Sequence, residues 1–263
     1  MPPARKRARS HDPAKTRAAV LGQLAHVREA VRGLTPGQLV LPTRLGPWTV
    51  RDLGAHVGTA LTAVRRALEL PAPAGQHLIT PVGWPFSAGS RVDGHAGEPP
   101  VAPPDLDAYL ADVDRSLRAL LDAHPGGRLL DTGAGAMPLD DYLLTRTVEL
   151  VVHTDDLNAA VPGLQVPYER QALAIATRLL ADALAVKAPG GSTEVRVPPY
   201  AVVQCVEGPR HTRGTPPNVV ETDPLTWIRL ATGRVTWADA LAEAKVSASG
   251  ERADIGGLLP LTP

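Results

Sequence analysis

The regular spacing of apolar residues in the first 160 positions constrains the fold more than any other feature of the sequence. Between Pro13 and Leu34, apolar residues recur at alternating intervals of four and three: Val20, Leu24, Val27, Val31 and Leu34. This period places them on one side of a helix that packs against a core. The segments near 49–70, 104–123 and 138–160 show the same pattern. Together with one long connection, these amphipathic helices predict a four-helix bundle.

Signals between the helices refine this prediction. Thr49 precedes the second helix and Asp52 occupies its third position, which is typical of a capping box. The connection over residues 71–104 is rich in Pro and Gly and contains Trp84. A connection of this length inside a compact domain is usually functional or partly disordered. We expect a second, Gly-rich loop over residues 131–138.

The pattern changes after Pro162. A helical pattern over residues 167–187 is followed by short runs of strand-forming residues and by two short helices with capping residues at their starts. The predicted strands are Glu194–Val197, Tyr200–Glu207, 218–222 and a run that begins at Lys245. We therefore predict an α+β fold that consists of a basic disordered tail (1–12), a helix bundle (13–163) and a smaller α+β domain (164–263).

Composition excludes several classes of protein. The 27 Lys and Arg residues balance 27 Asp and Glu residues, so no overall field favours nucleic acid or an anionic membrane, although the tail is basic. The single cysteine, Cys205, excludes internal disulfides and cysteine-rich metal sites, and its apolar surroundings predict a packing role. The sequence contains no membrane-spanning run and no apolar signal segment, so we expect a cytoplasmic protein.

Two of the eight histidines, His56 and His153, lie at the edge of a predicted inward helix face. Four leucines mark that face on the fourth helix: Leu139, Leu143, Leu150 and Leu157. Glu149 lies one turn before His153, and two ligands from one helix with a third from a facing helix are typical of metal sites in bundles. His, His and Glu with an open position form a known catalytic zinc set. An ion pair between Glu149 and His153, with His56 hydrogen-bonded in the core, fits the same spacing.

Two neighbouring residues favour the metal site. Arg146 lies near the centre of the same inward face, where a charge requires an anionic partner or ligand, and we assign it to cofactor binding. Asp156 lies about one turn after His153 and can bind its second ring nitrogen. This arrangement is usual for a metal-bound histidine.

The two helices that carry these residues resemble a known family. The segments GPWTVRDLGAHVG (46–58) and RTVELVVHTDDL (146–157) look like the paired metal helices of the mycothiol-dependent maleylpyruvate isomerase family, which belongs to the wider DinB-like four-helix bundles. The resemblance implies that His56, Glu149 and His153 bind a divalent metal ion, with zinc the expected metal, and that mycothiol is the thiol cofactor.

The resemblance extends over residues 15–263. The stretch ETDPLTWIRLATGRVTWADAL (221–241) is similar to the second domain of that family, which resembles sterol carrier proteins. Arg234 in this stretch matches an arginine implicated there in activity, which implies a catalytic role. By sequence alone, Arg234 also fits a cation near a helix C-terminus, next to Gly233.

These observations predict a metal-dependent enzyme that uses a low-molecular-weight thiol to isomerise or conjugate a small electrophilic substrate. A metal-coordinated thiol loses its proton, which provides a nucleophile without a protein cysteine. We expect the thiol to bind between the two domains, with Arg234 contributing from the second. The alternative is a sterol carrier-like protein that binds a lipid or another apolar ligand without catalysis.

Overall fold

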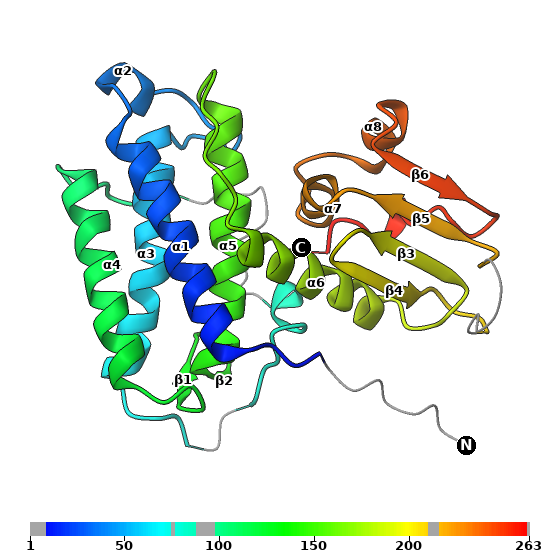
Figure 1. The fold of residues 1–263 in the computed structure, drawn as a ribbon, viewed down its shortest axis with the longest axis horizontal. Coiled ribbons are helices and arrows are strands. Elements are labelled where there is room, and N and C mark those ends of the chain that lie inside the picture. Colours follow the sequence, from blue (N-terminus) through cyan, green and yellow to red (C-terminus); the bar gives the residue numbers. More distant parts are fainter. Residues whose placement is uncertain (1–8, 75–76, 88–97, 210–215, 262–263) are drawn as a thin grey trace.

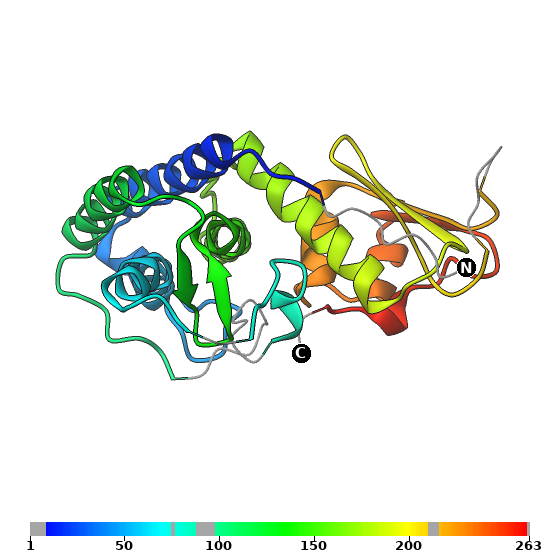
Figure 2. The ribbon, with the colours of Figure 1, turned by 90° about the horizontal axis from the view of Figure 1, so that it is seen from below.

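The computed structural model of the chain describes residues 9–74, 77–87, 98–209 and 216–261. Its N-terminal part is a bundle of four long helices: α1 (Pro13–Arg32), α3 (Val50–Glu69), α4 (Leu106–Ala123) and α5 (Leu139–Ala160). Figure 1 shows these helices side by side, and Figure 2 looks nearly along α3 and α5. The predicted bundle is confirmed, and the helix boundaries agree with the apolar periodicity to within about two residues.

The start of α3 agrees with the sequence in detail. Asp52 donates its backbone N–H to the Thr49 hydroxyl at 3.3 Å, and the Thr49 N–H donates to the Asp52 carboxylate at 2.9 Å. These reciprocal bonds form the predicted capping box. A second capping box, between Thr35 and Gln38, starts the short helix α2 (Pro36–Leu39), which the sequence analysis did not predict.

Helix α5 lies against α1, α3 and α6 (Arg170–Lys187). The four leucines that mark its predicted inward face are buried. Every residue from Tyr142 to Leu157 is buried, however, so the helix does not have the solvent-exposed polar side that a one-sided pattern predicts. The reason is that other elements cover α5 on both sides, and its charged residues are therefore enclosed by protein.

The predicted loop over residues 131–138 is wrong. These residues belong to a small hairpin of β1 (Leu129–Asp131) and β2 (Ala136–Pro138), with Gly133 at positive φ in its turn. The connection before α4 joins it, because Ile79 donates its N–H to the Ala136 carbonyl at 3.0 Å. Strands of three residues are too short to produce a visible alternation, and the partner of this hairpin lies far away in the sequence.

The connection between α3 and α4 is only partly described, because residues 75–76 and 88–97 of the predicted segment lie outside the described ranges. Its described part contains the short 3₁₀ helix η1 (Trp84–Phe86), in which the Trp84 side chain is almost fully buried. Residues 1–8 of the predicted tail also lie outside the described ranges. In the remainder of the tail, Arg9 pairs with Asp182 of α6 at 2.8 Å.

The C-terminal part contains a four-stranded sheet with the order β4-β3-β5-β6. Its strands are β3 (Thr193–Val197), β4 (Ala201–Cys205), β5 (Val219–Thr222) and β6 (Val246–Ser249). Strands β3 and β5 are parallel, and the other neighbours are antiparallel. The shorter helices are α7 (Pro224–Ala231), α8 (Trp237–Ala242) and the 3₁₀ helix η2 (Gly256–Leu258). The predicted α+β class is confirmed.

Helix α6 connects the two parts of the molecule. It packs against α1 and α5 of the bundle, and also against α7 and β4 (Figures 1 and 2). Because this helix contacts both parts, the domain boundary near residues 161–166 stays a prediction. No helix in the described ranges is both long enough and apolar enough to cross a membrane.

Candidate functional site

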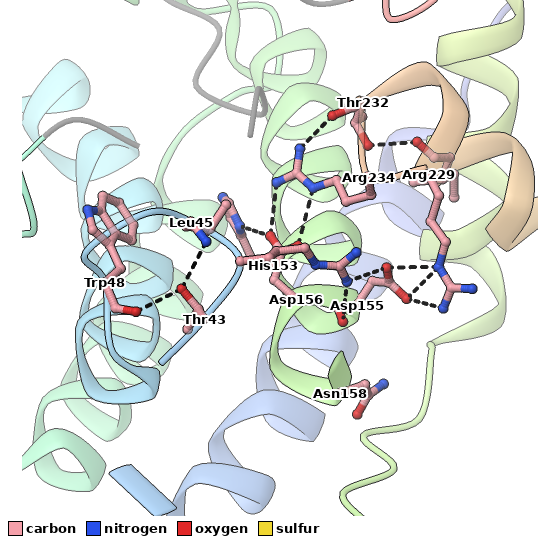
Figure 3. Close-up of polar contacts among 12 residues, drawn as sticks. Thr43, Leu45, Trp48, His153, Asp155, Asp156, Asn158, Arg229, Thr232 and Arg234 are labelled. Atoms are coloured by element: carbon pink, nitrogen blue, oxygen red, sulfur yellow. Dashed lines mark hydrogen bonds and ion pairs between the residues drawn. The ribbon is translucent and has the colours of Figure 1, made fainter. Parts of the chain in front are cut away.

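The candidate site is a group of charged and imidazole side chains on the buried length of α5. Its members are Arg146, Glu149, His153, Asp155 and Asp156. Arg146, Glu149, His153 and Asp156 are spaced by three or four positions and therefore lie on one side of the helix. His153, Asp155 and Asp156 contact α3, the loop before it and the segment around α7. Figure 3 shows His153, Asp155 and Asp156 between the loop that carries Trp48 and the segment that carries Arg229 and Arg234.

His153 and His56 come together from α5 and α3. Their ring centroids lie 4.9 Å apart and the rings are nearly perpendicular, at 89°. His153 is 2% exposed, and its Nδ1 lies 2.9 Å from Asp156 Oδ2. An ionised carboxylate can only accept, so Nδ1 donates, and Nε2 is the ring nitrogen that faces away from this contact. That Nε2 atom is buried and has no hydrogen-bond partner among the described residues. The predicted contact between Asp156 and His153 is confirmed.

Glu149 has a different partner from the one expected of a metal ligand. Its Oε2 accepts a hydrogen bond from Arg146 Nη1 at 2.9 Å, and both side chains are buried. The Arg146 guanidinium also lies over the rings of Tyr142 and Trp84, at 4.5 and 5.5 Å from their centroids. The anionic partner that the sequence analysis required for Arg146 is therefore Glu149 on the same helix, and the aromatic rings add cation–π contacts.

The predicted three-residue metal site is only partly assembled. The two histidines are close, but the described part of the chain contains no group of three His, Cys, Asp or Glu side chains placed to hold a metal ion. No ion pair between Glu149 and His153 is found in the described ranges either, since each of them has another partner. The assignment of His56, Glu149 and His153 as metal ligands stays a prediction.

Asp156 joins the histidine pair to the C-terminal part. Arg234 donates from Nη2 to Oδ2 at 2.9 Å and from Nε to Oδ1 at 3.2 Å, and its side chain is 1% exposed. Arg44 Nε lies 2.8 Å from Oδ1 of the same carboxylate. Burial alone would raise the pKa of Asp156, but the contacts with His153 and Arg234 more than offset it and hold the pKa well below its usual value. Arg234 thus meets the site through Asp156, behind His153.

Asp155 forms a second set of ion pairs beside the first. Arg229 Nη2 lies 2.6 Å from Asp155 Oδ1, Arg44 Nη2 lies 2.8 Å from Oδ2, and the Tyr168 hydroxyl donates to Oδ1 at 3.0 Å. Burial raises the pKa of Asp155. The hydrogen bond and charge of Arg229, together with the charge of Arg44, lower it by more than burial raises it, so the pKa lies below its usual value and the carboxylate stays ionised.

Arg44, Asp155, Arg229 and Tyr168 were not predicted as site residues from the sequence. One signal could have indicated them: the pair Asp155-Asp156 directly precedes Leu157, one of the four leucines that mark the predicted inward face of the helix. Two buried carboxylates require cations or donors from elsewhere in the chain. The sequence does not show which arginines supply them, because the contacts span more than 70 residues.

Trp48 lies on the other side of the histidine pair. Its ring centroid is 4.9 Å from that of His56, with an interplanar angle of 59°. Trp48 is 6% exposed, so it shields this side of the His56 ring from solvent. The site as a whole offers the buried Nε2 of His153, carboxylates and guanidinium groups. The single cysteine lies elsewhere, in β4, and burial raises its pKa to about 11. Among the described residues, the site therefore contains acceptors and donors of hydrogen bonds and both signs of charge, but no cysteine.

Two known families match the sequence. The family described as "Mycothiol maleylpyruvate isomerase N-terminal domain" matches residues 20–158, and the family described as "Bacterial SCP ortholog" matches residues 169–261. A comparison with curated proteins gave no match.

Solved structures provide a likeness over the whole chain. The crystal structure of a mycothiol-dependent maleylpyruvate isomerase superposes with a TM-score of 0.54 and 15% sequence identity, over 96% of this chain and 97% of that one. A variant of that protein with one histidine replaced by alanine gives a TM-score of 0.52 at the same identity and coverage. At this identity the likeness describes the fold. The first family match spans just over half of the 263 residues, and the chain therefore belongs to the mycothiol maleylpyruvate isomerase family.

Proposed function

We propose that this protein is a thiol-dependent isomerase whose site is formed by His56, Glu149 and His153 with a divalent metal ion, and that mycothiol is its thiol. The family membership and the fold likeness to a mycothiol-dependent maleylpyruvate isomerase support the thiol and the reaction class. The small electrophilic substrate is then an unsaturated acid of the maleylpyruvate type. Conjugation of the thiol to the electrophile is the related reaction that the same site would support.

One observation carries the metal part of the proposal. His153 Nε2 is buried, has no hydrogen-bond partner among the described residues and belongs to a ring whose Nδ1 is bound by Asp156. A buried polar atom without a partner costs free energy, whereas a metal ligand at this atom requires a ring with its proton on Nδ1 and a lone pair on Nε2. The His56 ring, 4.9 Å away between centroids, supplies a second imidazole. These residues fit a divalent ion such as zinc.

Glu149 fits the third position less directly. Its carboxylate has two oxygens, and the contact with Arg146 uses Oε2. A carboxylate can accept from a guanidinium with one oxygen while the other binds a cation. We therefore assign Arg146 two tasks: it orients Glu149, and it attracts the anionic groups of the thiol cofactor or the substrate.

The bound ion would lower the pKa of a coordinated thiol, so that a thiolate forms near neutral pH. The protein side chains then have separate tasks. Asp156 holds the His153 ring in one tautomer and orientation, and Arg234 holds Asp156. The buried position of these groups excludes water around them, which strengthens their electrostatic interactions. In this arrangement Arg234 supports the reaction from behind His153.

Metal analysis combined with a turnover assay tests the proposal. We expect about one divalent ion per purified chain and consumption of maleylpyruvate that depends on added mycothiol. The variant His153→Ala should lose the ion and more than about 100-fold of the turnover, because it lacks a ligand rather than an outer partner. Arg28→Met is the matched control, since Arg28 forms an ion pair with Asp107 in the bundle away from the site.

Two results would contradict the proposal. Full turnover by metal-free protein would remove the ion from the mechanism. Absence of mycothiol-dependent turnover in the metal-loaded protein, combined with displacement of a fluorescent fatty acid, would instead favour the carrier function that the sterol carrier-like resemblance suggests. The turnover of His153→Ala is interpreted only after its unfolding curve has verified that the variant is folded.

A further inference from the structure

The side chain of Arg44 connects two carboxylates of the site. Its Nε lies 2.8 Å from Asp156 Oδ1, and its Nη2 lies 2.8 Å from Asp155 Oδ2 and 2.9 Å from the Asp155 carbonyl oxygen. Among the described residues, Arg44 is the side chain that forms ion pairs with both aspartates. One guanidinium thus binds two neighbouring residues of α5 at three acceptor atoms.

The loop that carries Arg44 has a tight internal structure. Both the N–H and the hydroxyl of Thr43 donate to the Trp48 carbonyl at 2.9 Å, and the Leu45 N–H donates to the Thr43 hydroxyl at 3.1 Å (Figure 3). Gly46 adopts a positive φ of 65°, which favours glycine. Leu45 and Trp48 are buried, so both side chains attach the loop to the core.

This loop therefore touches both histidines of the pair, one directly and one through a carboxylate. Trp48 contacts the ring of His56, which lies on α3. Arg44 contacts Asp156, which binds His153 Nδ1. A continuous chain of contacts thus runs from the His56 ring through Trp48, Arg44 and Asp156 to the His153 ring, which contacts the His56 ring again. A shift of the loop would change the position of the Trp48 ring and one of the two arginine contacts of Asp156 together.

We propose that Arg44 is a positioning residue that fixes the geometry of the His56–His153 pair by fastening the Trp48 loop to Asp155 and Asp156. This inference rests on the proposed function for its effect on turnover. Its effect on the geometry of the two rings does not depend on what the protein catalyses.

The shape of the arginine side chain is part of the argument. A guanidinium presents donors in a planar fork, which can bind two carboxylates and a carbonyl at once. A lysine at position 44 would supply one compact charge and could not bind all three acceptors with the same geometry. The conservative variant Arg44→Lys therefore separates charge from shape.

The other arginines allow the fold to persist without Arg44. Arg229 remains on Asp155, and Arg234 remains on Asp156. Neither carboxylate is left as an uncompensated buried charge, which is the situation that unfolds proteins. The Arg44 side chain is 28% exposed, compared with 1% for Arg234. Its ion pairs are therefore partly solvated, and their removal should lower the free energy of unfolding by less than removal of the Arg234 pair.

The experiment compares Arg44→Met, Arg44→Lys and the control Arg28→Met. Arg28 has a similar exposure, 34%, and also joins two elements through one carboxylate. The imidazole ¹⁵N and ¹H resonances of His56 and His153 are recorded for each protein, and kcat and KM are measured with mycothiol and maleylpyruvate. In Arg44→Met we expect shifted signals for both rings, a kcat lower by about tenfold and a KM within about twofold of the wild type. Arg44→Lys should restore less than half of the lost kcat, and Arg28→Met should leave all these quantities unchanged.

The outcomes are distinct. Unchanged ring signals in a folded Arg44→Met protein would overturn the inference, whatever its turnover. Full rescue by Arg44→Lys would also overturn it, because charge alone would then suffice. If the wild type shows no mycothiol-dependent turnover, the proposed function fails, and the ring signals still decide the role of Arg44. Changes in signals throughout the molecule would show a general loss of structure and contradict a local positioning role.

Discussion

The helix bundle and the C-terminal sheet bury different kinds of polar residue. In the described ranges, the buried charged and imidazole side chains lie on α5, between Arg146 and Asp156, with the exception of Arg234, whose side chain reaches Asp156 from the C-terminal part. Apart from Arg234, the buried polar residues of the C-terminal part beyond α6 are neutral: Ser192, Thr193, Asn218, Thr222, Thr226 and Thr232. A hydroxyl or amide can be satisfied locally by backbone groups, whereas a buried charge requires a counter-charge.

The C-terminal part contributes to the site through two arginines. Arg229 and Arg234 extend from α7 and the residues after it to Asp155 and Asp156 on α5 (Figure 3). The sheet behind them is an ordinary apolar core with alternating buried positions. The buried charged side chains are therefore concentrated on one helix of the bundle, and the C-terminal part supplies counter-charges that neutralise and orient them.

The largest expected effect comes from removing the carboxylate on which this comparison depends most. Asp156→Ala would leave Arg234, at 1% exposure, without its counter-charge and would leave His153 Nδ1 without its acceptor. We expect the free energy of unfolding to fall by about 3–5 kcal/mol, the cost of breaking a buried pair on one side. Denaturant unfolding followed by circular dichroism measures it.

The control for this prediction is Asp112→Ala, which removes an exposed pair with Arg115 on α4. It should change the free energy of unfolding by less than about 0.5 kcal/mol. A loss of similar size in the two variants would show that the buried charges of α5 contribute no more to stability than an exposed ion pair on α4.

A smaller effect is expected where the pair is partly solvated. Arg229→Met removes the bidentate partner of Asp155, and the Arg229 side chain is 42% exposed. Hydrogen bonds to charged groups contribute about 1.5–3 kcal/mol, and solvent screening places this pair at the low end of that range. We expect a loss of about 1.5 kcal/mol near neutral pH, measured by denaturant unfolding.

The pH dependence of this loss has a definite sign. The pKa of Asp155 is lowered in the folded protein from its ordinary value of 3.8, so its contribution to stability is complete above that value. The contribution decreases as the pH falls through the lowered pKa, because protonation removes the partner of Arg229. The difference between wild type and Arg229→Met should therefore shrink at acid pH. A difference that grows on acidification would mean that Asp155 is not stabilised as a carboxylate.

The sequence predicted the elements whose contacts are local. The helices of the bundle follow from apolar periodicity, the start of α3 follows from Thr49 and Asp52, and the contact between His153 and Asp156 follows from a spacing of three residues. The β1–β2 hairpin and the full burial of α5 could not be predicted, because both depend on segments remote in the chain.

The same distinction applies to the site. His56 and His153 are on the expected inward sides of their helices and meet. The partner of Glu149 was not predicted, although Arg146 lies three residues away, because the sequence alone does not decide between a ligand and an ion pair. Arg44 was missed because nothing in a loop sequence indicates that its side chain binds two residues more than 100 positions later.

The smallest expected effect concerns the cysteine in the C-terminal sheet. Cys205 is fully buried in β4, and burial raises its pKa to about 11, so at neutral pH it is a protonated, enclosed thiol. If the chemistry belongs to α5 and an added thiol, Cys205→Ala should leave mycothiol-dependent turnover within about twofold of the wild type. A disulfide reagent such as Ellman's reagent should label the native protein slowly and the unfolded protein at once, since the thiolate is the reacting species and the folded sheet hides it. Rapid labelling of the native protein, accompanied by loss of turnover, would give the C-terminal part a nucleophile of its own and would end the division of tasks between the two regions.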